Sequence, residues 1–239
     1  MSAAPPQGFS PARRALAWGV HAFTASGAVL GAVSLLAIRS GDLRLAAALM
    51  LVALFLDAVD GTLARAVRVS EVLPYMDGRR LDDMVDYLNY VVVPAVFMVA
   101  AQSLVSPLFV AVPILASAYG FAHHDAKTED DFFLGFPSYW NVVALYLWLF
   151  GASPRAGTAL VALFAALVFV PLKYLYPSKM SVLRHTTNAA AGVWWFAMLG
   201  CVLTPGAARA FSLAELSLVF PAYYFVASLW LGGLHRSGR

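Results

Sequence analysis

The segment DAVDGTLARAVRVSEVLPYMDGRRLDDMVDY, residues 57–87, brings a group of carboxylates into an otherwise apolar chain. Asp57 and Asp60 are three residues apart and Asp82 and Asp86 are four apart, so each pair shares one face of a helix. Carboxylates are costly near a bilayer and mark a functional site by default. Two antiparallel helices that present these pairs at one depth would form an all-oxygen cage suited to Mg²⁺ or Mn²⁺. The spacing therefore predicts a divalent-metal site, because four carboxylates this close could not all stay ionised without a cation.

The four aspartates are assigned different roles in this site. Asp57, Asp60 and Asp82 are the first-choice metal ligands. Asp86 is either a further ligand or the general base that takes the proton of an alcohol. A carboxylate beside two cations would be a weak base, so metal binding is the firmer expectation for all four.

The composition predicts a membrane protein. Of the 239 residues, 61% are hydrophobic and 12% are charged, which is far more apolar than a soluble globular domain. No polar linker divides the chain, so residues 1–239 are expected to form one domain, with residues 1–12 disordered. The single cysteine, Cys201, excludes an intrachain disulfide framework. The expected partners are membrane lipid and small molecules, not nucleic acid.

Apolar runs near the length needed to cross about 30 Å of hydrocarbon predict the transmembrane helices. They lie at residues 15–38, 43–66, 81–102, 104–122, 139–153, 156–173, 187–205 and 212–234. The predicted fold is therefore an all-α, polytopic membrane helical bundle with about eight transmembrane helices.

The distribution of basic residues predicts the orientation of this bundle. With eight spans both termini lie on one side of the membrane. Four basic residues fall on the opposite side: Arg39, Arg44, Arg155 and Arg209. The other twelve of the sixteen share the side of the termini: Arg13, Arg14, Arg65, Arg68, Arg79, Arg80, Lys127, Lys173, Lys179, Arg184, Arg236 and Arg239. By the positive-inside rule, the termini and the aspartate cluster face the cytoplasm.

The ordered spacing around the aspartates matches a known signature at eight positions. In this chain it reads Asp57-x2-Asp60-Gly61-x2-Ala64-Arg65-x12-Gly78-x3-Asp82-x3-Asp86. This resembles the signature of the CDP-alcohol phosphotransferases, integral membrane enzymes that move a substituted phosphate from a CDP-linked donor to an alcohol. The twelve-residue gap is longer than is usual in the family. Together with the chain length, the eight spans and the segment AKTEDDFFLGFPSYWN (126–141), it is similar to the bacterial branch whose donor is CDP-diacylglycerol and whose acceptor is choline.

The resemblance implies roles for the residues that match the signature. It favours Asp86 as the general base, with two ions of Mn²⁺ or Mg²⁺ as cofactor and CMP as the leaving group. It also implies a bacterial inner-membrane location, and homodimers are common in the family. The expected nucleotide-binding residues are Gly61, Ala64, Arg65, Gly78 and Thr24. The glycines and the alanine would let the nucleotide approach the backbone, and Arg65 is placed for a phosphate.

The choline acceptor would need aromatic faces and negative potential, because a quaternary ammonium donates no ordinary hydrogen bond. The segment before the fifth apolar run supplies both, and the preferred residues are Tyr139 and Trp140 for their rings and Asp130 and Asp131 for their charge. An interfacial aromatic belt would account equally well for the two rings.

Two other functions stay open at this point. Within the family, the acceptor could be another alcohol such as serine. From a different class, a cation-coupled transporter would use the acids as ion sites. Asp83 serves as an internal comparison, because it lies about 100° round the helix from Asp82 and outside the signature. It is expected to cap the helix or to pair with Arg79 or Arg80.

Overall fold

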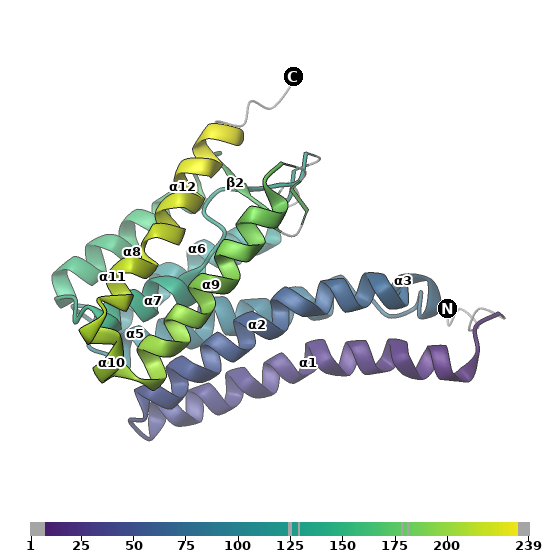
Figure 1. Ribbon diagram of the computed structural model, residues 1–239, viewed down its shortest axis with the longest axis horizontal. Coiled ribbons are helices and arrows are strands. Elements are labelled where there is room, and N and C mark those ends of the chain that lie inside the picture. The colour runs from purple at the N-terminus through teal and green to yellow at the C-terminus, as the bar shows by residue number, and fades with distance from the viewer. Residues whose placement is uncertain (1–7, 124–125, 129, 178, 181, 234–239) are drawn as a thin grey trace.

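The computed structural model describes residues 8–123, 126–128, 130–177, 179–180 and 182–233. The described chain is a bundle of helices with one small antiparallel sheet (Figure 1). Its elements are α1 (Pro11–Arg39), α2 (Leu43–Val67), α3 (Val69–Val72), α4 (Gly78–Asp86), η1 (Tyr87–Val92), α5 (Val93–Ala100), η2 (Pro107–Val110), α6 (Ala111–Ala122), β1 (Phe132–Leu134), α7 (Trp140–Leu149), α8 (Pro154–Val168), β2 (Lys173–Leu175), α9 (Arg184–Leu203), α10 (Pro205–Ala210), α11 (Leu213–Ser217) and α12 (Val219–Leu231).

Helices α1 and α2 form a long antiparallel pair that extends beyond the rest of the bundle (Figure 1). Ser10 caps α1 by accepting a hydrogen bond from the Arg13 N–H, and Pro11 stands in the first turn, where its missing N–H costs nothing. The C-terminal end of α2 is followed by Arg68, which adopts the left-handed conformation with φ of 59° and so stops the helix. The pair carries the first half of the aspartate signature on α2.

Two glycines of α1 let the third apolar run approach closely. A Cβ atom on Gly27 would lie 2.6 Å from Cγ1 of Val85, and one on Gly31 would lie 2.8 Å from Cδ2 of Leu88. Small residues four apart are a common means of close helix packing in membranes. The Asn89 amide also donates to the Gly27 carbonyl at 2.9 Å. Helix α1 therefore holds α4 and η1 at a fixed distance, and with them the second half of the signature.

The third run is helical throughout but changes its pitch. Asp77 caps α4 by accepting from the Arg80 N–H at 3.2 Å. After Asp86 the helix widens into the π-helical segment η1 and returns to α geometry at α5. Pro94 accounts for this change, because it lacks the N–H that would bond to the Tyr90 carbonyl and its ring would clash with that carbonyl in an α-helix.

The remaining helices enclose the main hydrophobic core. Its largest fully buried side chains include Trp140, Phe97, Met50 and Leu51. Strand β1 pairs antiparallel with β2, so that Phe133 lies opposite Tyr174. This two-stranded sheet joins the segments before α7 and after α8.

The exposed surface suits a lipid environment. Four helical stretches in the described ranges are long and apolar enough to cross a membrane: Pro11–Arg39, Gly78–Ala100, Arg184–Leu203 and Leu213–Leu231. Three shorter apolar helical stretches accompany them: Pro107–Ala122, Trp140–Leu149 and Pro154–Val168. Large apolar side chains such as Leu36, Leu163, Phe196 and Trp230 point outward, as expected where lipid covers a helix.

The structure confirms the predicted helical membrane bundle and corrects several boundaries. Each of the eight predicted apolar runs contains helix. The run 156–173 was expected to be helical to its end, but α8 stops at Val168 and Lys173 belongs to β2, because Pro171 cannot continue a helix. The two-stranded sheet was not predicted. Of the segment 1–12, residues 1–7 lie outside the described ranges, and α1 begins at Pro11.

Candidate metal centre

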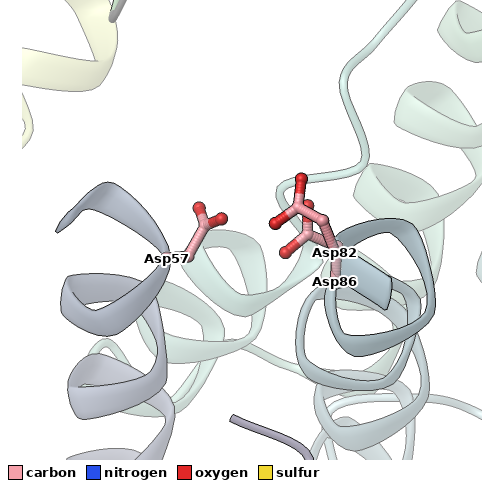
Figure 2. A group of neighbouring side chains, drawn as sticks. All are labelled: Asp57, Asp82 and Asp86. Carbon is pink, nitrogen blue, oxygen red and sulfur yellow. The ribbon is translucent and has the colours of Figure 1, made fainter. Parts of the chain in front are cut away.

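Three carboxylates from two helices converge on one point. Asp57 on α2 faces Asp82 and Asp86 on α4, and one oxygen of each lies within 4.8 Å of the others (Figure 2). All three side chains are half-buried. Helical periodicity produces the arrangement on α4, where a spacing of four residues stacks the two carboxylates on one face. The structure thus brings together three of the four predicted metal ligands.

Asp60 lies one turn further along α2, beside this group. It is 6% exposed, and its Oδ2 accepts a hydrogen bond of 2.8 Å from the Thr24 hydroxyl on α1. Its charge acts repulsively on the three clustered carboxylates. Thr24, predicted as a nucleotide contact, therefore fixes the orientation of the fourth predicted ligand.

Tyr90 also contacts the cluster, although it was not among the predicted site residues. Its hydroxyl donates to Oδ2 of Asp57 at 2.6 Å, and its side chain is buried in η1. Its ring centroid lies 6.0 Å from that of Tyr139. The signal in the sequence was its position four residues after Asp86, which places it on the same helical face.

The predicted nucleotide residues other than Thr24 lie on α2 and α4, the two helices that carry the cluster. Gly61 follows Asp60 on α2, and an added Cβ there would meet the flexible end of Arg65, at 3.3 Å from Nη1. Arg65 is exposed and donates to the Thr62 hydroxyl at 3.1 Å. Gly78 starts α4 against His21, whose Cε1 would lie 3.0 Å from an added Cβ.

Ala64 is half-buried and packs against a small apolar cluster that includes Val69 and Val72. The open face at Gly61 and Arg65 is consistent with the approach of a nucleotide. Ala64, in contrast, is partly covered by other side chains of the protein.

The predicted acceptor residues separate into two environments. Tyr139 lies inside, between Tyr90 and Tyr224, with ring centroids 6.0 and 5.8 Å away. Trp140 is fully buried in the core, where its indole N–H donates to the Ser117 hydroxyl at 2.7 Å. Only Tyr139 of the two therefore borders the aspartate cluster.

Asp130 and Asp131 immediately precede β1 and pair with lysines. Lys173 donates to Asp130 at 2.5 Å, and this hydrogen bond lowers the pKa of the Asp130 carboxyl below its ordinary value. Lys179 lies 3.7 Å from Asp131. Both carboxylates thus already have cationic partners.

Asp83 is not one of the converging carboxylates, as expected, but its partner was predicted incorrectly. Its Oδ1 lies 3.8 Å from the Nζ of Lys127, which the chain folds back toward α4. Arg80 instead pairs with Asp77 at 3.3 Å. A lysine 44 positions further along the chain could not be identified by helical spacing.

The donor set fits a hard divalent cation. No lysine or arginine in the described ranges makes an ion pair with Asp57, Asp82 or Asp86. Three half-buried carboxylates with no lysine or arginine in ion-pair contact need a positive charge between them, and ligands that offer only oxygen suit Mg²⁺ and Mn²⁺. These residues can therefore hold such an ion, with Asp60 adjacent.

Comparison with known proteins agrees with this chemistry. The family model described as CDP-alcohol phosphatidyltransferase matches residues 21–204. A phosphatidylcholine synthase of Legionella pneumophila is 44% identical over 197 residues, which cover 77% of each chain. One of Pseudomonas aeruginosa is 35% identical over 224 residues, or 92% of this chain and 94% of that protein. One of Borreliella burgdorferi is 34% identical over 220 residues, or 90% and 94%.

Proposed function

Because the chain belongs to the CDP-alcohol phosphatidyltransferase family, we propose that it transfers the phosphatidyl group of CDP-diacylglycerol to choline, forming phosphatidylcholine and CMP. The convergence of Asp57, Asp82 and Asp86 carries this proposal, because these carboxylates occupy signature positions and meet in space. The choice of substrates is supported by the activity for which the relatives are named.

The reaction needs an alcohol oxygen to attack the phosphorus that carries diacylglycerol. A new bond forms from that oxygen to phosphorus, and the bond from phosphorus to the bridging oxygen breaks, so that CMP leaves with the electron pair. The alcohol proton passes to a carboxylate oxygen of Asp86, the general base. Mn²⁺ or Mg²⁺, in our proposal two ions held by Asp57, Asp60, Asp82 and Asp86, would neutralise the pyrophosphate charge and polarise the reacting phosphate.

The residues around the cluster position the substrates. The open face at Gly61 and the Arg65 guanidinium would receive the nucleotide and its phosphates. Gly78 and Thr24 border the same region. On the other side, the ring of Tyr139 together with the carboxylates offers the aromatic face and negative potential that suit choline. Asp130 and Asp131 are further candidates for the acceptor site, whereas Trp140, which the sequence also suggested, is fully buried and bonded to Ser117, so its proposed contribution is to the fold.

We place this site at the cytoplasmic face of a bacterial inner membrane. Support comes from the twelve basic residues expected on that side against four on the other. Lys127 supports it further, because it pairs with Asp83 next to the cluster and so lies at the same end of the bundle.

The test is CMP release by the purified protein in detergent, with CDP-diacylglycerol and Mn²⁺ or Mg²⁺. Choline, serine, glycerol phosphate, inositol and no acceptor are compared. We expect release that depends on both choline and metal. Release with a different alcohol would keep the family reaction and reject choline, whereas no release with any acceptor from folded protein would reject the transferase function and favour a transporter.

A further inference from the structure

Tyr90 makes the contact that connects the aspartate cluster to the aromatic interior. Its hydroxyl donates to Oδ2 of Asp57 at 2.6 Å, a length typical of a hydrogen bond to an ionised carboxylate. The Tyr90 side chain is 6% exposed, so its hydroxyl has little access to water and needs a protein partner.

The π-helical geometry of η1 aims this hydroxyl. In an α-helix, each step of four residues advances a side chain by about 40°, so Tyr90 would lie about 80° round from Asp82. A π turn contains roughly one residue more, which turns residue i+4 back by roughly 70°. Tyr90 therefore stays nearly in line with Asp82 and Asp86 and points at Asp57 on the facing helix. Isolated π turns occur frequently at functional sites.

From this geometry we infer that Tyr90 is a positioning residue that holds Asp57 in the orientation needed to bind the metal. The inference rests on the proposed metal role of Asp57. The hydroxyl bonds to Oδ2 alone, so the other carboxylate oxygen of Asp57 is not bonded to Tyr90, and an oxygen of Asp57 lies within 4.8 Å of oxygens of Asp82 and Asp86. A phenol suits this task because it is a neutral donor. It fixes the carboxylate and leaves intact the negative charge that the cation requires. An arginine or lysine would cancel that charge.

The test compares Tyr90→Phe with Tyr87→Phe. Both tyrosines lie in η1, but the Tyr87 hydroxyl donates to the Ile114 carbonyl of α6 at 2.9 Å and not to the cluster. Partners that hydrogen-bond to metal ligands contribute about 10- to 100-fold to metal affinity. We expect Tyr90→Phe to raise the Mn²⁺ Kd at least about tenfold and Tyr87→Phe to change it less than about twofold.

Mn²⁺ binding is measured without substrate, by the loss of the free-ion electron paramagnetic resonance signal. The Mn²⁺-induced rise in Tm is recorded for each variant against its own metal-free protein, which separates binding from any general loss of stability. At saturating Mn²⁺ the choline KM of Tyr90→Phe should stay within about twofold of the parent, because the ring next to Tyr139 is retained. If a variant does not survive purification, the Mn²⁺ dependence of choline incorporation is titrated in native membranes.

Equal Mn²⁺ affinity of Tyr90→Phe and the parent protein would overturn the inference, as would an equal loss in Tyr87→Phe. Failure of the parent protein to bind Mn²⁺ would instead overturn the proposed metal site. Tenfold weaker binding confined to Tyr90→Phe would support both.

Discussion

Two adjacent aspartates provide the sharpest test of the cluster. Asp82→Asn and Asp83→Asn are the same isosteric change, one residue apart on α4. Asp82 contributes one of three converging carboxylates, whereas Asp83 points to Lys127. Replacement of a side chain that merely supports a metal ligand costs about 10- to 100-fold, so loss of a ligand itself should cost more. We expect kcat/KM of Asp82→Asn to fall more than about 100-fold, equivalent to about 2.7 kcal/mol of transition-state stabilisation.

The matched change at Asp83 should be mild. Its oxygen lies 3.8 Å from the Lys127 nitrogen, and the two side chains are 40% and 39% exposed. Such a solvated pair contributes about 0 to 1 kcal/mol, which limits the loss of rate to about fivefold. The assay is the initial rate of CMP release with choline at saturating Mn²⁺, on protein shown to be monodisperse. Activity of Asp82→Asn within tenfold of the parent, or an equal loss in Asp83→Asn, would refute the assignment.

The remaining predictions concern the acceptor, the helix packing and the metal. Tyr139→Leu should raise the choline KM about three- to tenfold, because a cation–π contact is lost. Trp140→Phe should lower Tm and leave the choline KM unchanged. The reverse pattern would move the acceptor site to Trp140. Gly31→Ala should destabilise the protein by about 1 to 3 kcal/mol, because the added Cβ would lie 2.8 Å from Leu88. Gly19→Ala should not destabilise it, because nothing lies within 4 Å of an added Cβ there. Thermal unfolding of both variants in detergent tests this difference. Chelation with EDTA should abolish CMP release and added Mn²⁺ should restore it; activity that persists after complete chelation would contradict a metal requirement.

Periodicity predicted those features that depend on one helix at a time. The three-residue spacing on α2 and the four-residue spacing on α4 are local properties, and the ordered signature linked the two helices. The side-chain contacts around them join distant parts of the chain. Lys127 reaches Asp83, and β1 pairs with β2 some 40 positions later, and neither pairing leaves a periodic trace. Tyr90 follows Asp86 by four residues, which suggests a shared face, but its contact with Asp57 also depends on the pitch of η1, which only Pro94 inside an apolar run hinted at.

Neighbouring residues at the start of α7 show a second limit. Tyr139 and Trp140 are adjacent and both aromatic, so composition assigned them the same role. The helix begins between them, and their side chains turn to different surroundings, one toward the cluster and one into the core. The direction in which a side chain points at the start of a helix depends on backbone angles, and composition does not specify these angles.

The length of α7 has a consequence for how the protein responds to its bilayer. Its ten residues rise about 15 Å, roughly half of a hydrocarbon core of about 30 Å. A lipid-facing helix this short would suffer severe hydrophobic mismatch and would thin the membrane around it. None of the residues of α7 is exposed, so other parts of the protein meet the lipid in its place. The depth of Tyr139 is therefore set by protein contacts, and membranes of different thickness should leave the distance between the acceptor ring and the aspartates unchanged.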